Sequence, residues 1–260
     1  MQRMFQLTAW NWHMARRGVA AVGLLLTACE LALLAWRAFD VEFALYTYNS
    51  LFVVAHLPDA FAVGYLAVLA ASLYPLLLAQ GRARAGYTML TLPMPRWQLL
   101  AAQVLTSILA LLALMAWQVL LTVLCYGPVT AIQARAALLG TPLRQAGRFW
   151  WSLAGNPLLR MLLPTDLVSV GFVLAYLAAP AILGAGVLLH RGWRRITAIV
   201  MLLVGAVCCY ALVGAQLLHI AQSGEQASEA LRWGAGPLGI VLLLAWLWDL
   251  RALHRAELTR

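Results

Sequence analysis

Long apolar segments alternate with short arginine-bearing segments along the whole chain. A helix that crosses the hydrocarbon layer of a bilayer needs about 20 consecutive apolar residues. The segments of this kind predict six membrane-spanning helices, near residues 18–36, 60–80, 99–125, 166–190, 196–220 and 234–250. Their apolar positions are continuous and do not alternate with polar ones, which argues against the strands of a membrane barrel. We therefore expect an all-α polytopic membrane protein with a single transmembrane domain over residues 1–260.

The first seventeen residues are less apolar than the predicted spans and have their own pattern. Their apolar side chains recur at helical spacing, at Met4, Leu7, Trp10 and Met14. Tryptophan and arginine in this segment suit the boundary between lipid and water, which predicts an interfacial helix over residues 1–17 leading into the first span. Arg3 and Asn11 interrupt the apolar face, so an irregular cytoplasmic end stays open as the alternative.

Arginine placement predicts the orientation, because basic residues near the ends of spans favour the cytoplasmic side. With both termini cytoplasmic, the cytoplasmic arginines are Arg3, Arg16, Arg17, Arg82, Arg84, Arg96, Arg191, Arg194, Arg195, Arg251, Arg255 and Arg260. The arginines on the other side are then Arg37, Arg135, Arg144, Arg148, Arg160 and Arg232. Several of these lie in the connection 126–164, where an aromatic and basic cluster around Arg148 predicts short helices at the outer surface.

Composition supports the membrane assignment and explains the charge. Hydrophobic residues make up 64% of the chain, charged residues make up 10%, and the mean hydropathy is +0.84. The net charge of +9 comes from arginines distributed over span ends. They do not form one basic stripe with interleaved aromatic residues, so membrane orientation explains them better than nucleic-acid binding.

One processing signal competes with the first span. The sequence Leu26-Thr27-Ala28-Cys29 follows Arg16-Arg17 and an apolar run, an arrangement similar to the cleavage box of a bacterial lipoprotein. Cleavage there would remove the first span. The apolar run nevertheless continues past Glu30 to Trp36, which favours an uncleaved helix.

The chain lacks the residue patterns of several reaction types. All eighteen basic residues are arginine, so neither a lysine-dependent phosphate loop nor lysine catalysis is available. The histidines lack the spacing of a shared helical metal face, and the Gly-x-Ser-x-Gly pattern of serine hydrolases is absent. We therefore expect no catalytic, cofactor or metal site in this chain.

The segment between the second and third spans contains a pattern of glycine, leucine, proline and arginine, at Gly86, Leu90, Leu92, Pro93 and Arg96. This pattern resembles the cytoplasmic loop of the permease subunits of type-2 ABC exporters. Prolines end one short helix, and Arg96 with Trp97 anchors the start of the next at the interface. Members of that family usually place a glutamate shortly before the glycine, where this chain has Arg82 and Arg84.

The resemblance implies a function as well as an architecture. The loop would couple the chain to cytoplasmic ABC ATPase subunits, expected as two copies, which would bind the ATP and magnesium. The chain itself would be a non-enzymatic permease in a bacterial inner membrane. It would pair with an identical or related membrane subunit and would export an amphipathic lipid, drug or peptide.

Glu30, Tyr74 and Gln118 are the candidate residues of a substrate pathway. Glu30 is the one acidic residue deep within a predicted span, where a charged group is usually paired, protonated or exposed to a polar cavity. It is either a substrate or proton contact or a structural hydrogen-bond partner. Its possible structural partners are Gln103, Gln118 and Gln216. The alternative function is a membrane-embedded enzyme or scaffold without an ATPase partner.

Overall fold

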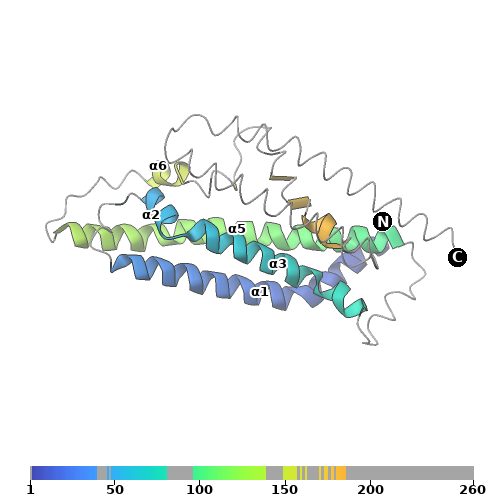
Figure 1. The fold of residues 1–260 in the computed structure, drawn as a ribbon. Helices are drawn as coiled ribbons and strands as arrows, with labels where there is room; N and C mark the ends of the chain where they lie inside the picture. The colour runs from blue at the N-terminus through green and yellow to red at the C-terminus, as the bar shows by residue number, and fades with distance from the viewer. Residues whose placement is uncertain are drawn as a thin grey trace.

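A computed structural model describes most of the N-terminal half of the chain and isolated positions beyond it. The described residues are 2–39, 46, 48–80, 96–138, 149–156, 159, 162, 170, 173–174, 177–178 and 180–185. Their helices are α1 (Gln2–Ala38), α2 (Tyr48–Val54), α3 (Leu57–Gln80), α5 (Arg96–Leu138) and α6 (Phe149–Ala154) (Figure 1). No strand occurs among these residues, which confirms the all-α prediction for this part of the chain.

Among the described residues, three helices are long and apolar enough to cross a membrane. The candidate spans are Met4–Ala38 in α1, Leu57–Tyr74 in α3 and Trp97–Arg135 in α5, and they correspond to the first three predicted spans. The described positions within the predicted fourth span are helical. The predicted spans 196–220 and 234–250 lie outside the described residues.

The three long helices form a bundle in which α1 and α5 run in one direction and α3 runs in the other (Figure 1). Two contacts between α1 and α5 agree with the parallel direction of these helices, because Asn11 meets Gln103 and Glu30 meets Gln118 further along both helices. The start of α1, the end of α3 and the start of α5 therefore share one end of the bundle, which we call the N-terminal end. The opposite end holds α2, α6 and the last turns of α5, and we call it the cap end.

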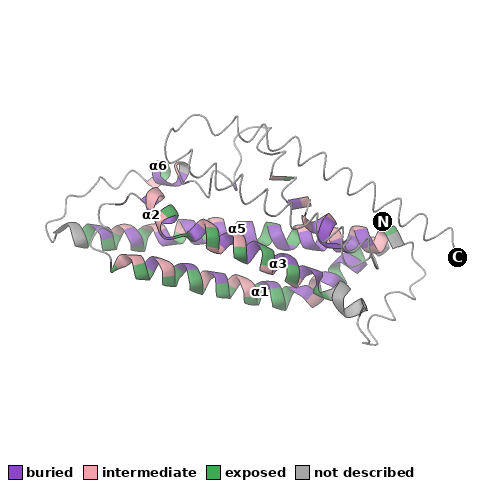
Figure 2. Cartoon of the chain, viewed as in Figure 1, coloured by how far each residue is buried: buried purple, intermediate pink, exposed green. Residues whose placement is uncertain are grey.

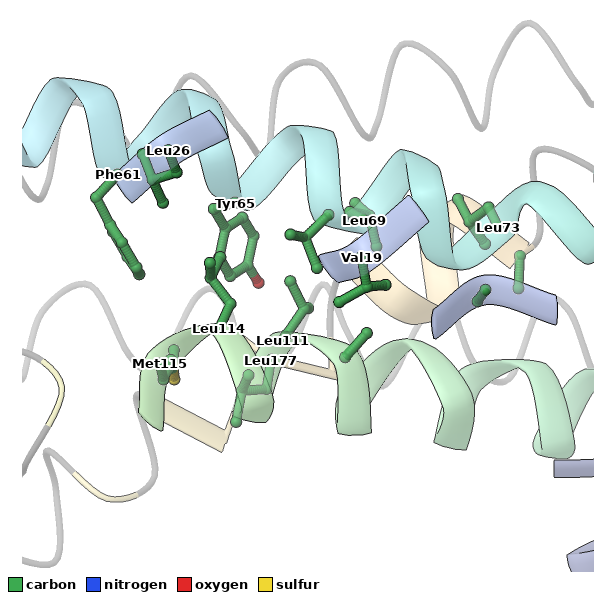
Figure 3. Packing of buried hydrophobic residues seen from close by; sticks show 14 of the residues in the cluster. Val19, Leu26, Phe61, Tyr65, Leu69, Leu73, Leu111, Leu114, Met115 and Leu177 are labelled. Carbon is green, nitrogen blue, oxygen red and sulfur yellow. The ribbon is translucent and has the colours of Figure 1, made fainter. Parts of the chain in front are cut away.

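The core lies where the three helices face one another, as Figures 2 and 3 show. Leu26 of α1, Tyr65 of α3 and Leu111 of α5 are buried in the same apolar cluster, which Leu177 also joins. Gly64 permits the close approach of α1 and α3. A Cβ atom built at Gly64 would lie 2.6 Å from Cδ2 of Leu26, so a side chain here would require Leu26 to move.

One face of α5 is buried over most of its length. The buried positions recur in steps of four, four and three residues, at Gln103, Ser107, Leu111, Leu114, Gln118, Thr122, Cys125, Val129 and Gln133. This spacing is an 11-residue repeat, which keeps one stripe of a nearly straight helix facing its neighbours. The remaining surface of α5 includes exposed leucines, as expected for a helix in contact with lipid.

Exposed aromatic side chains occur at both ends of the bundle. Trp10 and Trp97 are exposed at the N-terminal end, and Trp36, Phe39 and Trp150 are exposed at the cap end. The 26 residues from Trp10 to Trp36 span about 39 Å at 1.5 Å per residue. Because a bilayer with its headgroups is about 40–45 Å thick, these tryptophans are spaced to lie in its two interfacial layers.

Two helices are longer than the sequence pattern predicts. Residues 2–17 are not a separate helix, because α1 continues from Gln2 through Gly18 to Ala38. The predicted third span ends at residue 125, whereas α5 continues through Pro128 to Leu138. Tertiary contacts explain this extension, since Val129 is buried in an apolar cluster of the cap end and Gln133 binds the chain at Tyr46. Helix α6 confirms a short helix in the predicted connection 126–164.

Candidate functional site

Polar side chains lie on the buried faces of the three long helices. Members that are less than a tenth exposed include Thr8, Asn11, Glu30, Ser72, Gln103, Thr106, Ser107, Gln118, Thr122 and Gln133. A buried polar group is costly unless it is hydrogen-bonded, and more so where water is excluded. Their partners therefore determine how the helices hold together.

A first polar cluster joins all three helices in the half of the bundle nearer the N-terminal end. Nδ2 of Asn11 donates to Oε1 of Gln103 over 3.4 Å, and Nε2 of Gln103 donates to the main-chain carbonyl of Ser72 over 2.8 Å. The hydroxyls of Ser72 and Ser107 are 2.9 Å apart. We call these four residues the serine–glutamine cluster.

A second polar contact joins α1 to α5 nearer the cap end. Nε2 of Gln118 donates to Oε2 of Glu30 over 2.8 Å. Glu30 is 2% exposed and Gln118 is fully buried. Oε1 of Glu30 and Oε1 of Gln118 have no hydrogen-bond partner among the described residues. Of the three glutamines that the sequence offered to Glu30, the structure pairs it with Gln118, while Gln103 joins the other cluster and Gln216 lies outside the described residues.

The cap end is held by hydrogen bonds to main-chain carbonyls. Nη2 of Arg37 donates over 3.1 Å to the carbonyl of Val54, the last residue of α2. A cation suits this position because the carbonyls at a helix C-terminus carry partial negative charge. Nε2 of Gln133 donates over 2.9 Å to the carbonyl of Tyr46.

Aromatic rings connect α2, α5 and α6 in the cap. Tyr48 packs edge-to-face against Phe52 and Tyr126, and Tyr126 packs in the same way against Phe149 of α6. The Tyr48 hydroxyl donates to the carbonyl of Thr122. Burial raises the pKa of Tyr48 above its ordinary value of 10.0, with smaller contributions from Cys125 and Tyr126. This hydroxyl therefore stays protonated and able to donate.

The structure brings together only part of the predicted pathway. Glu30 and Gln118 are in contact, but Tyr74 is half exposed. Because Leu26 lies beside Gly64, Tyr74 is about 20 Å further along the bundle from Glu30. It does not share a site with them.

The predicted coupling segment lies almost wholly outside the described residues. Arg96 is the first residue of α5, and α3 ends at Gln80, so the segment between them begins and ends at the N-terminal end of the bundle. The other four members of the pattern, Gly86, Leu90, Leu92 and Pro93, lie between these two residues and are not described.

The serine–glutamine cluster was not predicted from the sequence. In the sequence Asn11 interrupts an apolar face, yet in the structure it is 1% exposed. The signal was present in the spacing of Asn11, Ala15 and Val19, which all lie on the buried face of α1. Four-residue spacing places these residues on one side of a helix.

The described residues contain no group of three histidine, cysteine or acidic side chains that could hold a metal ion. No family model, curated protein or solved structure matches the chain. Its function is therefore inferred from its own residues and their arrangement.

Proposed function

We propose that this chain is the transmembrane permease subunit of an ATP-driven exporter of the type-2 ABC class. The observation that carries the proposal is the placement of the segment from Gln80 to Arg96. This segment carries the pattern from Gly86 to Arg96 and joins two membrane-length helices at the N-terminal end of the bundle. An ATPase docked there would act directly on the ends of α3 and α5.

The hydrogen bonds within the bundle support a coupled movement of its helices. Gln103 lies seven residues after Arg96 and binds both Asn11 of α1 and Ser72 of α3. Gln118 ties α5 to α1 again further along. A displacement at Arg96 would therefore move these helices as a packed unit, as alternating access by rigid-body rocking requires.

The proposal includes partners that follow from the type of transporter. Two cytoplasmic ATPases would bind ATP and magnesium, and a second membrane subunit, identical or related, would complete the pathway. The membrane would be the bacterial inner membrane, with six spans and both termini in the cytoplasm. The cargo would be an amphipathic lipid, drug or peptide that enters between the membrane subunits.

The test is purification of the tagged chain in a gentle detergent, with identification of co-purifying proteins and an ATPase assay. We expect an ATPase subunit with a phosphate-binding loop to co-purify. Pro93→Ala and Arg96→Ala should lower the ATPase activity of the complex several-fold. Arg135→Ala is the matched control, because Arg135 is an exposed arginine near the other end of α5 and should leave the activity unchanged.

Two results would overturn the proposal. A chain that purifies without any ATPase would favour an enzyme or scaffold in the membrane. Equal effects of Arg96→Ala and Arg135→Ala on ATPase activity would show that the segment before α5 has no special role in coupling.

A further inference from the structure

Glu30 and Gln118 form a contact that is incomplete as it stands. One hydrogen bond joins them, from Nε2 of Gln118 to Oε2 of Glu30 over 2.8 Å. The second oxygen of each side chain, Oε1 of Glu30 and Oε1 of Gln118, has no partner among the described residues. Both side chains are buried within candidate membrane spans, so water does not readily supply the missing bonds.

The chemistry of the two orphan atoms is the same. An ionised carboxylate only accepts hydrogen bonds, and the carbonyl oxygen of a glutamine side chain also only accepts. Two acceptors cannot satisfy each other, but one proton between them satisfies both. A proton bound to Oε1 of Glu30 turns this atom into a hydrogen-bond donor. The acceptor is then Oε1 of Gln118, which belongs to the amide that already donates to the same carboxyl group.

We propose that Glu30 and Gln118 form a proton-binding site in the membrane-embedded bundle, in which Glu30 is a neutral carboxylic acid paired with the amide of Gln118 by two hydrogen bonds. In this pair Gln118 donates from Nε2 to Oε2, and Glu30 donates from Oε1 to Oε1 of Gln118. The pair carries no net charge, which suits its burial among apolar side chains.

A metal ion fits this position less well than a proton. Calcium and magnesium are bound by six or more oxygen ligands, whereas the pair offers two free oxygens. The described residues also provide no further acidic, histidine or cysteine side chains that would complete a metal site.

The described charged and titratable groups toward the cap-end half of the bundle do not include a free cation for Glu30. These groups are Arg37 on α1 itself, Cys125 and Tyr126 on α5, Tyr48 on α2, Tyr65 and Asp59 on α3, and His56 just before α3. Arg37 is bonded to the carbonyl of Val54, and His56 lies 2.9 Å from Asp59. An ionised Glu30 would therefore face its neighbours without a counter-charge from the described residues.

The proton-binding site lies in the contact between α1 and α5. The argument for it does not depend on the exporter proposal. When the proton is present, two hydrogen bonds hold the helices together at this level. Loss of the proton would leave a buried carboxylate beside the amide oxygen of Gln118, so it would weaken the contact and favour separation of the two helices. The packing of α1 against α5 would thereby depend on the protonation state of Glu30.

Infrared spectroscopy of the full chain in lipid vesicles at neutral pH tests the proposal. The difference between the wild type and Glu30→Gln should show loss of one carboxylic-acid carbonyl band, with no loss of carboxylate bands. Gln118→Leu should keep this band but shift it to higher frequency, because the acid loses its hydrogen bonds to the amide. Asp59→Asn is the matched control and should remove carboxylate bands only, since Asp59 is an exposed acid beside His56.

The opposite spectrum would overturn the proposal. Loss of a carboxylate band in Glu30→Gln would show that Glu30 is ionised, and a wild-type band that depends on sodium concentration would show a bound metal cation. If Glu30→Gln does not fold, solid-state NMR of the wild type labelled with 13C at glutamate carboxyl groups decides the matter. The proposal then requires one glutamate with an acid chemical shift at neutral pH, and the absence of such a signal rejects it.

Discussion

The side-chain amide of Gln103 on α5 donates a hydrogen bond of 2.8 Å to the main-chain carbonyl of Ser72 on α3. Pro75, three residues after Ser72, has no N–H to donate to the carbonyl of Ala71, the residue before Ser72. A donor from a neighbouring helix therefore reaches the main chain where the internal hydrogen bonding of α3 is weakened by proline. The relationship ties α5 to the backbone of α3, beyond the contacts of their side chains.

Gln103→Leu should destabilise the bundle, because it leaves Asn11 and the carbonyl of Ser72 buried without this partner. A buried polar group left unsatisfied costs about 1–3 kcal/mol. Thermal unfolding in detergent, followed by circular dichroism, would measure the effect. Gln98→Leu is the control, since Gln98 is only partly buried on the same helix and should change the midpoint little. Equal shifts in the two variants would argue against a specific role for Gln103.

Gly64→Leu should separate α1 from α3, because even a Cβ atom at this position meets the Leu26 side chain at 2.6 Å. Overpacking of this kind costs about 1–3 kcal/mol. The double variant Gly64→Ala with Leu26→Ala should be less destabilised than the sum of the single variants. Unfolding midpoints of the four proteins give the coupling energy directly.

Gly23→Ala provides the matched comparison for Gly64. A Cβ atom at Gly23 meets nothing within 4 Å, so the alanine should be neutral or stabilising by up to about 1 kcal/mol through its higher helix propensity. A loss of stability in Gly23→Ala similar to that in Gly64→Ala would contradict the close approach at Gly64.

Tyr48→Phe should make the protein less sensitive to alkali. Burial raises the folded-state pKa of Tyr48 above its ordinary value of 10.0, so this side chain ionises at lower pH in the unfolded chain than in the folded protein. The wild type therefore loses stability as the pH rises above 10. The variant lacks this titration, although it also loses about 1 kcal/mol at neutral pH with the bond to Thr122. Thermal unfolding midpoints of the two proteins, measured from neutral to strongly alkaline pH, should converge as the pH rises. A constant difference between the two midpoints would contradict the contribution of Tyr48 ionisation.

Single cysteines should be labelled from two different sides of the membrane. In a background without the native cysteines, Gln6→Cys and Thr88→Cys should react with a membrane-impermeant maleimide on one side. Phe39→Cys and Trp150→Cys, at exposed positions of the cap end, should react on the other. Labelling would be measured in sealed vesicles of both orientations, so that each side of the membrane is exposed to the maleimide in turn. If all four positions react from the same side, the bundle does not span the membrane.

The first three spans could be predicted because each depends on a local property, a run of apolar residues long enough to cross a bilayer. The ends of the helices were less predictable. Gly127 and Pro128 resemble a helix end in the sequence, and only the burial of Val129 and the bond from Gln133 to Tyr46 explain why α5 continues. Helix α2 was missed because it is short and packs its buried rings against distant parts of the chain.

The candidate site was predicted only in part for a related reason. Glu30 stands out in the sequence as an acid within an apolar run, but three glutamines on two predicted spans could have met it. The choice of Gln118 depends on the register in which α1 packs against α5, and the sequence of either helix alone does not define this register.

The sequence by itself determined the helical class, the membrane environment and the presence of an acid within a span, because these follow from the solvent preference of consecutive side chains. Only the tertiary structure decided which polar groups meet. Asn11 and Tyr74 illustrate the difference, since the first is buried against Gln103 and the second is exposed on α3. Helical periodicity places a residue on a face, and packing against a particular neighbour determines whether that face is buried.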